Sequence, residues 1–362
     1  MLVESSPWAG RRVLVTGHTG FKGGWLALWL QHLGATVVGM ALEPPTNPSF
    51  FKQARLAELF AHHIADVRDE AAVARVIADA RPEIIFHLAA QPLVRYSYDH
   101  PVETYATNIM GTVHVLEAAR KVESLQAVIC ITTDKCYENR EWVWPYREND
   151  PMGGHDPYSS SKGAAELVIS AYRRSYPEGP LIASVRAGNV IGGGDWALDR
   201  LVPDTIRALL CGQTVAIRNP SSVRPWQHVL EALGGYLEIG QRLLAGQASV
   251  ATAYNFGPAQ DDSRPVEWIV ERMLELWGGP SEWARPRGEQ PHEATLLRLD
   301  CSKARAELGW EPRLRLSQAL ERVVDWHKQV AGGSDPREVS LRQISEYMAL
   351  SPITKAAGSR RS

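Results

Sequence analysis

The sequence contains few cysteines, almost no net charge and no long apolar run. Four cysteines occur among 362 residues, at positions 130, 136, 211 and 301, and their spacing matches no metal-ligand motif. The 39 basic and 41 acidic residues are dispersed, so the chain shows no nucleic-acid surface. No apolar run approaches the ~20 residues that span a bilayer, and the first residues lack a signal-peptide pattern. We expect free thiols in a reducing cytoplasm, no metal, no nucleic acid and no membrane partner.

Apolar runs of strand length alternate with segments of helical periodicity in the first half of the chain. The expected strands are 11–17, 35–42, 63–67, 83–90, 125–131 and 181–190, and the expected helices are 21–33, 69–80, 101–122 and 157–176. Strand–helix–strand units repeated this often predict an α/β fold. The expected architecture is a Rossmann-type, doubly wound parallel sheet with helices on both faces.

The regular alternation weakens after residue 190. We expect residues 1–190 to form the sheet domain, and a helical pattern within 226–258 to return to it. Residues 191–225 and 259–350 are expected to form a smaller, mainly helical C-terminal substrate domain. The segment 212–229 is predicted to be a short hairpin or an extended segment. Residues 351–362 are predicted to be a frayed tail.

A glycine-rich turn, TGHTGFKG, follows the first expected strand. Gly17, Gly20 and Gly23 give the pattern G-x-x-G-x-x-G, which suits a tight turn and the close approach of a pyrophosphate to the backbone. The helix that follows directs its free N–H groups at the anion. Glycines alone are a weak signal and also suit a purely structural turn. Their position between a strand and a helix indicates a dinucleotide site.

Acidic residues at later strand ends extend this prediction. Glu43 lies twenty residues after Gly23, where a carboxylate bonds the adenosine ribose hydroxyls and favours NAD over NADP. Alternatively, Glu43 is a loop residue that faces solvent. Asp66 and Val67, at the end of the third strand, are candidate adenine contacts.

Tyr158 and Lys162, in the stretch YSSSK, lie one helical turn apart and share a helix face. We expect the lysine ammonium to lower the pKa of the phenol, so that Tyr158 acts as a base near neutral pH. With the glycine turn and the strand end at Thr132 and Thr133, this pair resembles the extended short-chain dehydrogenase/reductase family. The resemblance covers roughly residues 10–325, and members of this family act on nucleotide sugars.

The resemblance implies a set of cofactor contacts for NAD. These are Gly17, Thr19, Gly20, Phe21, Lys22, Gly23, Glu43, Asp66, Val67, Leu88, Ala89, Ala90, Thr107, Tyr158 and Lys162.

The fifth strand ends in ITTDKCY, which delivers Thr133, Asp134 and Lys135 together. A solvated loop with an incidental charge pair is one interpretation. However, this stretch, GHTGFKGGWLALWL, RPWQHVLE and LDCSKARAELGW together resemble the CDP-glucose 4,6-dehydratases. The resemblance implies oxidation at sugar C4, loss of water across C5 and C6, and reduction at C6 with bound NAD. Thr133 then holds the 4-hydroxyl and Asp134 is the acid at C6. Lys135 is either the C5 base or an electrostatic stabiliser of the enolate.

The resemblance also implies the substrate contacts and the oligomer. The expected sugar-nucleotide contacts are Gln91, Thr133, Asn189, Arg200, Arg224 and His292. Helices 101–122 and 157–176 are expected to pair across subunits in a homodimer or a dimer of dimers. Two alternatives remain. One is another nucleoside-diphosphate-hexose 4,6-dehydratase or a 4-epimerase, although Asp134 argues against an epimerase. The other is a non-catalytic NAD-binding sensor.

Overall fold

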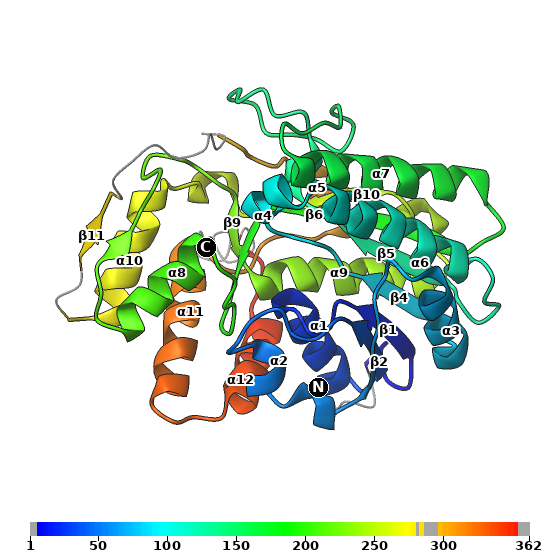
Figure 1. The fold of residues 1–362 in the computed structure, drawn as a ribbon, viewed down its shortest axis with the longest axis horizontal. Coiled ribbons are helices and arrows are strands. Elements are labelled where there is room, and N and C mark those ends of the chain that lie inside the picture. The colour runs from blue at the N-terminus through cyan, green and yellow to red at the C-terminus, as the bar shows by residue number, and fades with distance from the viewer. Residues whose placement is uncertain (1–5, 280–281, 286–295, 354–362) are drawn as a thin grey trace, which may run out of the picture.

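The structure, a computed structural model, describes residues 6–279, 282–285 and 296–353. Its centre is a seven-stranded parallel sheet in the order β10-β6-β5-β4-β1-β2-β3 (Figure 1). The strands are β1 (Arg12–Thr16), β2 (Thr36–Ala41), β3 (Ala61–Ile64), β4 (Ile84–His87), β5 (Ala127–Ile131), β6 (Leu181–Ala187) and β10 (Ala253–Phe256). The strand order reverses between β1 and β4, and ligands of such sheets bind outside the carboxyl ends at this reversal. The predicted doubly wound sheet is confirmed.

Helices cover both faces of the sheet, because neighbouring residues of a strand point to opposite faces. Val13 and Val15 of β1 join a core with helices α1 (Phe21–His32) and α9 (Val229–Leu244). Leu14, between them, joins a second core with α3 (Glu70–Ala80), α6 (Gly111–Ala119) and α7 (Pro157–Ser175). Strands buried on both faces explain the nearly continuous apolar runs in the sequence.

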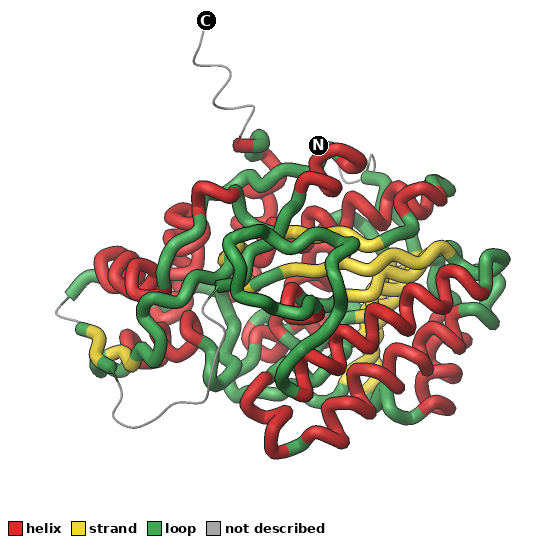
Figure 2. Tube along the Cα trace, turned by 90° about the horizontal axis from the view of Figure 1, so that it is seen from above, coloured by secondary structure: helices red, strands yellow, loops and turns green. Residues whose placement is uncertain are grey.

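A second group of helices lies beside the sheet (Figures 1 and 2). Helices α8 (Leu201–Leu210), α10 (Val266–Trp277) and α11 (Leu316–Ala331) enclose a third core. Two short parallel pairs accompany them: β7 (Asn189–Ile191) with β9 (Trp226–His228), and β8 (Val215–Ala216) with β11 (Trp283–Ala284). Helix α12 (Pro336–Ala349) packs against both α11 and α1. The predicted mainly helical second part is therefore present.

Three expected elements differ in the structure. The predicted helix 101–122 is divided into α5 (Pro101–Tyr105), a π-helical turn (Ala106–Met110) and α6. Two short helices that were not predicted, α2 (Phe50–Gln53) and α4 (Val94–Asp99), lie earlier in the chain. The predicted strand 181–190 breaks at Gly188, where a Cβ atom would lie 2.3 Å from Pro225 Cγ. Residues 212–229 form no hairpin, because β8 pairs with β11 and β9 pairs with β7.

The third strand, at one edge of the sheet, covers 61–64 instead of 63–67, because it pairs with β2 from Ala61 onwards. All four cysteines are unpaired, as expected, and Cys211 is the exposed one. Within the described ranges, no helix combines the length and the apolar character that a bilayer crossing requires.

Candidate active site

The glycine turn joins β1 to α1 at the point where the strand order reverses. Gly17 has a φ of +78°, and a Cβ atom there would lie 2.8 Å from the backbone nitrogen of Ala89. A Cβ atom at Gly23 would lie 2.2 Å from Gly17 O, so the turn tolerates no side chain at either position. Among the described residues, no side chain caps the start of α1 at Gly20, and no acidic residue lies in its first turn. The N–H groups of this helix end therefore suit a diphosphate.

The predicted adenosine contacts lie along the neighbouring strand ends. Thr19 Oγ1 donates to the carbonyl oxygen of Leu42 at 2.8 Å, which fixes the glycine turn to the end of β2. The next residue, Glu43, is exposed. Asp66 follows β3, and Arg68 donates to its carboxylate at 2.8 Å and lowers its pKa. Leu88, Ala89 and Ala90 follow β4 and are half-buried. Thr107 lies in the π-helical turn.

The carboxyl end of β5 carries the predicted acid. After Thr132 and Thr133, residues Asp134–Cys136 form a 3-10 turn. Thr133 Oγ1 donates to Asp134 Oδ1 at 2.9 Å, whereas Asp134 Oδ2 is buried without a hydrogen-bond partner in the part of the chain that the structure describes. Asp134 is 3% exposed, and burial raises the pKa of its carboxyl, against the opposing charges of Lys135 and Arg224. A carboxyl in this setting holds its proton more firmly than one in water.

Helix α7 brings the tyrosine and the lysine to the same edge. Asp156 caps the helix by accepting from Ser159 N at 2.9 Å, and Tyr158 follows one residue after Pro157 in the first turn. The expectation that the pKa of Tyr158 is lowered is wrong: burial raises the pKa to about 12. The groups that oppose this shift are Thr133, by a hydrogen bond, and Arg200, by its charge. Lys162 Nζ donates to Ile131 O at 3.4 Å, and burial lowers the pKa of Lys162 to about 8.

Two predicted diphosphate ligands approach this cluster from the second part of the chain. Arg200 lies at the start of α8, 3.5 Å from Asp195, and its charge acts on Tyr158 and on Lys22. Arg224 precedes β9, and its charge acts on Asp134. The arginines and the predicted acid and base thus share one electrostatic environment, although they are distant in the sequence.

Lys22 lies in the first turn of α1, next to Phe21. Its Nζ lies 5.9 Å from the centroid of the Tyr236 ring. Burial lowers the pKa of Lys22 to about 7, and the positive charges of Arg200 and Lys162 act in the same direction. The glycine turn therefore delivers a side-chain cation, in addition to backbone N–H groups, to the region that contains Lys162.

Other predicted contacts have different surroundings. Gln91 is buried, and its Nε2 donates to Leu93 O at 3.1 Å and to Thr104 Oγ1 at 2.9 Å, so both amide hydrogens are already used. Asn189 begins β7 and is half-buried. Lys135, in the turn after β5, is also half-buried. His292 lies outside the described residues.

Several buried polar groups that support the site were not predicted from the sequence. Asn108, in the π-helical turn, donates to Gln91 O at 3.1 Å and to Ser161 Oγ at 2.8 Å. Glu166 and Arg186 form a buried ion pair at 2.8 Å. The i, i+4 spacing from Lys162 to Glu166 was a usable signal for a shared helix face, but the pairing with Arg186 on β6 was not visible in the sequence.

The fold and the tyrosine–lysine pair beside a glycine turn define an extended short-chain dehydrogenase/reductase. A family model described as GDP-mannose 4,6 dehydratase matches residues 14–323. The chain therefore belongs to the GDP-mannose 4,6-dehydratase family.

Individual relatives agree with this family. A CDP-glucose 4,6-dehydratase of Salmonella typhimurium is 54% identical over 355 residues, which cover 96% of this chain and 99% of the relative. A dTDP-glucose 4,6-dehydratase of Xanthomonas campestris pv. campestris is 27% identical over 335 residues, which cover 87% of this chain and 92% of the relative. Among solved structures, DesIV of Streptomyces venezuelae, a dTDP-glucose 4,6-dehydratase with NAD and TYD bound, superposes with a TM-score of 0.75 at 23% identity, over 90% of this chain and 99% of that one.

Replacing Gly23 with alanine tests the glycine turn. Because the added methyl group collides with Gly17 O, the turn has to open, and overpacking of this kind costs about 1–3 kcal/mol. We predict that Gly23→Ala weakens NAD binding roughly 10- to 100-fold in calorimetric titrations of cofactor-free protein. Gly179→Ala is the control, because Gly179 lies before β6 at the opposite edge of the sheet and a Cβ there would be 3.3 Å from its nearest neighbour, Tyr176 O. Unchanged affinity in Gly23→Ala would contradict the assignment.

Proposed function

We propose that this chain is an NAD-dependent CDP-glucose 4,6-dehydratase, which converts CDP-D-glucose to CDP-4-keto-6-deoxyglucose and water. The observation that carries the proposal is the buried Asp134 carboxyl, with its raised pKa, beside Thr133 and Tyr158. An epimerase has no hydroxyl group to protonate and eliminate. The 54% identity to a CDP-glucose 4,6-dehydratase over nearly the whole chain supports the choice of substrate.

The cofactor fits the glycine turn, where Gly17 and Gly23 leave no room for side chains and the start of α1 is uncapped. When bound there, NAD supplies the oxidation at sugar C4 and the later reduction at C6. The turn, Lys22 and the small residues after β4 bind and orient it. Glu43 is assigned to the adenosine ribose, which favours NAD over NADP.

Tyr158 accepts the proton of the C4 hydroxyl, which Thr133 holds by a hydrogen bond. Because burial raises the pKa of the phenol to about 12, this step depends on the groups that stabilise the phenolate, Thr133 and Arg200. Lys162 contributes a positive charge to the same pocket. The 4-ketone that forms acidifies the C5 proton and prepares the sugar for elimination.

Elimination then requires a base at C5 and an acid at C6. We assign the base to Lys135, which adjoins the acid at the end of β5 and accepts the proton as the neutral amine. The C5 proton passes to Lys135, the double bond forms between C5 and C6, and Asp134 protonates the departing hydroxyl as water. Arg200 and Arg224 hold the diphosphate, together with Asn189.

The second part of the proposal is a homodimer, formed through α5, α6 and α7. Large apolar side chains on these elements face solvent, including Val102 at 81% exposure and Leu167 at 63%. Helices α5 and α6 both contact α7, so the three elements lie side by side (Figure 1). A face of this kind is typical of a subunit interface. The four unpaired thiols suit a reducing compartment, and we propose a cytoplasmic location.

Asp134→Asn separates the acid from the rest of the chemistry. The carboxamide keeps the shape of the side chain but cannot deliver an acidic proton, so turnover should fall roughly 10²- to 10⁴-fold. Oxidation at C4 should survive, so that reduced nicotinamide accumulates and is visible by its absorbance in a single turnover. Asp325→Asn, at an exposed position on α11, should behave as wild type. Full dehydration by Asp134→Asn would contradict the acid role.

Lys135→Met distinguishes the two roles of this lysine. If Lys135 is the C5 base, its loss should leave single-turnover formation of reduced nicotinamide intact, while exchange of the C5 hydrogen with solvent deuterium disappears. Lys52→Met, an exposed lysine on α2, is the control. Retained exchange in Lys135→Met would exclude the base role and leave only stabilisation of the enolate.

The proposed dimer predicts an effect of charge on the α7 face. Leu167→Glu buries a carboxylate in the interface, which is costly without a partner, so sedimentation should show monomers at low micromolar concentration. Leu210→Glu, at the exposed end of α8, is the control and should leave the dimer intact. A dimer of undiminished stability in Leu167→Glu would place the interface elsewhere.

A further inference from the structure

The acid Asp134 and the C4 base Tyr158 belong to different elements, and a buried carboxylate joins those elements. Thr133 and Asp134 follow β5, whereas Tyr158 and Lys162 belong to α7. Glu166 lies one turn beyond Lys162 and is 4% exposed. Its Oε1 accepts a hydrogen bond from Thr132 Oγ1 at 2.5 Å. The residue next to the catalytic threonine is therefore attached directly to the helix that carries the tyrosine.

The second oxygen of Glu166 extends this link to β6. Glu166 Oε2 accepts from Ser184 Oγ at 2.9 Å and from Arg186 Nη2 at 2.8 Å. Arg186 is 5% exposed, and its Nη1 donates to the hydroxyl of Tyr137 at 2.8 Å, just beyond the Asp134 turn. A single buried ion pair thus holds α7, β6 and both ends of the segment that contains Thr133, Asp134 and Lys135.

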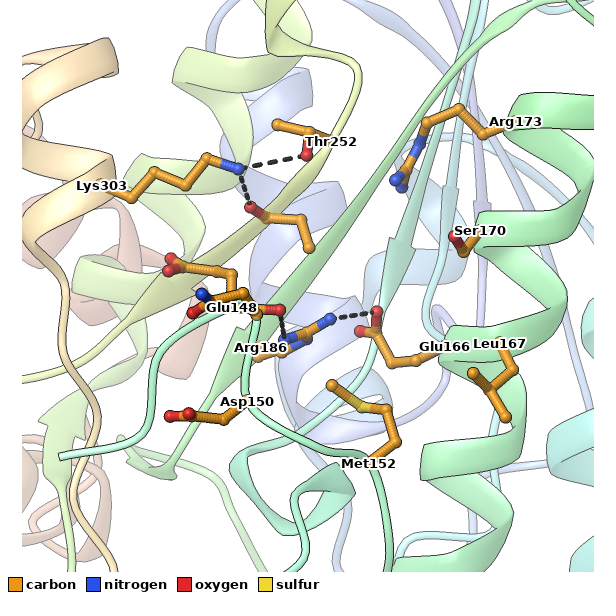
Figure 3. A pocket seen from close by; sticks show the side chains of 12 residues that line it. Glu148, Asp150, Met152, Glu166, Leu167, Ser170, Arg173, Arg186, Thr252 and Lys303 are labelled. Carbon is orange, nitrogen blue, oxygen red and sulfur yellow. Dashed lines mark hydrogen bonds and ion pairs between the residues drawn. The ribbon is translucent and has the colours of Figure 1, made fainter. Parts of the chain in front are cut away.

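Figure 3 shows the Glu166 carboxylate, which projects from α7, and the Arg186 guanidinium that meets it. Both line a pocket of about 450 Å³, together with Glu148, Arg173 and Lys303. None of the predicted cofactor or substrate contacts lines this pocket among the residues described. Glu166 therefore reaches the chemistry through Thr132 and Lys162, not by contact with the sugar nucleotide.

We propose that Glu166 is a positioning residue, which fixes the acid-bearing end of β5 to the Tyr158–Lys162 helix and stabilises the ammonium form of Lys162. This inference rests on the proposed function of the same site. It adds a residue that contacts neither reactant but sets both the geometry and the charge of the groups that do.

The charge part follows from the groups that surround Lys162. Burial lowers its pKa to about 8, and Cys130, Glu166 and Cys136 oppose this shift. Burial raises the pKa of both thiols, so both are neutral near pH 7, and the carboxylate of Glu166 is the charged member of this set. From neighbouring elements, His87 on β4 and Lys22 on α1 also face Lys162. Burial lowers the pKa of His87 to about 3, so it is uncharged, and protonated Lys22 repels Lys162.

Glu166→Gln tests the charge part. A lysine without its carboxylate partner loses its proton at a lower pH. The alkaline limb of the pH profile of kcat should therefore shift to lower pH by roughly one unit. At pH 8 this corresponds to a loss of roughly fivefold in kcat, which approaches tenfold well above pH 8. KM for CDP-glucose should change less than about twofold, because Glu166 does not contact the substrate. A folded Glu166→Gln protein with an unmoved alkaline limb, or with an effect on KM alone, would overturn this part.

Because Glu166→Gln leaves Arg186 buried without its partner, the single variant is expected to be less stable. Glu166→Gln/Arg186→Met removes both charges and provides a folded alternative. It should show a shift of the alkaline limb in the same direction, since Lys162 again lacks the carboxylate. A limb at the wild-type position in this double variant would also overturn the charge part.

Thr132 tests the geometric part without changing any charge. Thr132→Val removes the donor to Glu166 and keeps the shape of the side chain, so kcat should fall while the alkaline limb stays in place. Thr132→Ser restores the hydroxyl and should recover most of the lost turnover. Wild-type kcat in Thr132→Val, or equal loss in both variants, would overturn the link.

These outcomes are separable from failure of the proposed function. If wild-type protein does not dehydrate CDP-glucose, the proposed function fails directly. The role of Glu166 is then measured on the first hydride transfer with whichever hexose nucleotide reduces the bound cofactor, because Tyr158 and Lys162 serve that step whether or not water is lost afterwards.

Discussion

The burial of the Asp134 carboxyl is the constraint on which the chemistry of this site depends. In water this group would be an anion at neutral pH and could not donate a proton to a leaving hydroxyl. Asp134 is hydrogen-bonded to Thr133 and only 3% exposed, and this burial disfavours the charged form of its carboxyl. The same burial raises the pKa of Tyr158, so the environment that makes an acid of Asp134 also makes the phenol a reluctant base. The cations nearby, Arg200 in particular, are needed to offset this cost.

The topology of the sheet explains why these groups meet. Parallel strands place their carboxyl ends at one edge, and the strand order reverses between β1 and β4, which is where ligands of such sheets bind. Asp134 follows β5 and Tyr158 begins α7, so both lie at that edge. The second part of the chain then contributes the charges of Arg200 and Arg224. Glu166 and Arg186 form a buried ion pair that supports the site.

The sequence was sufficient for the local features of this structure and insufficient for those that depend on distant contacts. Buried strands such as β4 and β5 are continuous apolar runs, and the glycine turn and the Tyr158–Lys162 spacing are short-range patterns. The Glu166–Arg186 pair joins residues on separate elements, and no periodicity marks it. Asn108, in the π-helical turn, donates hydrogen bonds to Gln91 and Ser161, and the helical pattern of 101–122 gives no indication of these distant partners. The effect on Tyr158 was predicted with the wrong sign because spacing shows a neighbouring lysine but not the depth of burial.

The most direct test of the account is a panel of nucleoside-diphosphate hexoses incubated with the purified protein and analysed by mass spectrometry. The account predicts that CDP-glucose loses one molecule of water and gains a 4-keto group, with no net consumption of NAD. A hexose nucleotide that is only epimerised, with its mass unchanged, would contradict the assignment of Asp134 as an acid that expels the C6 hydroxyl. So would the absence of turnover with every member of the panel.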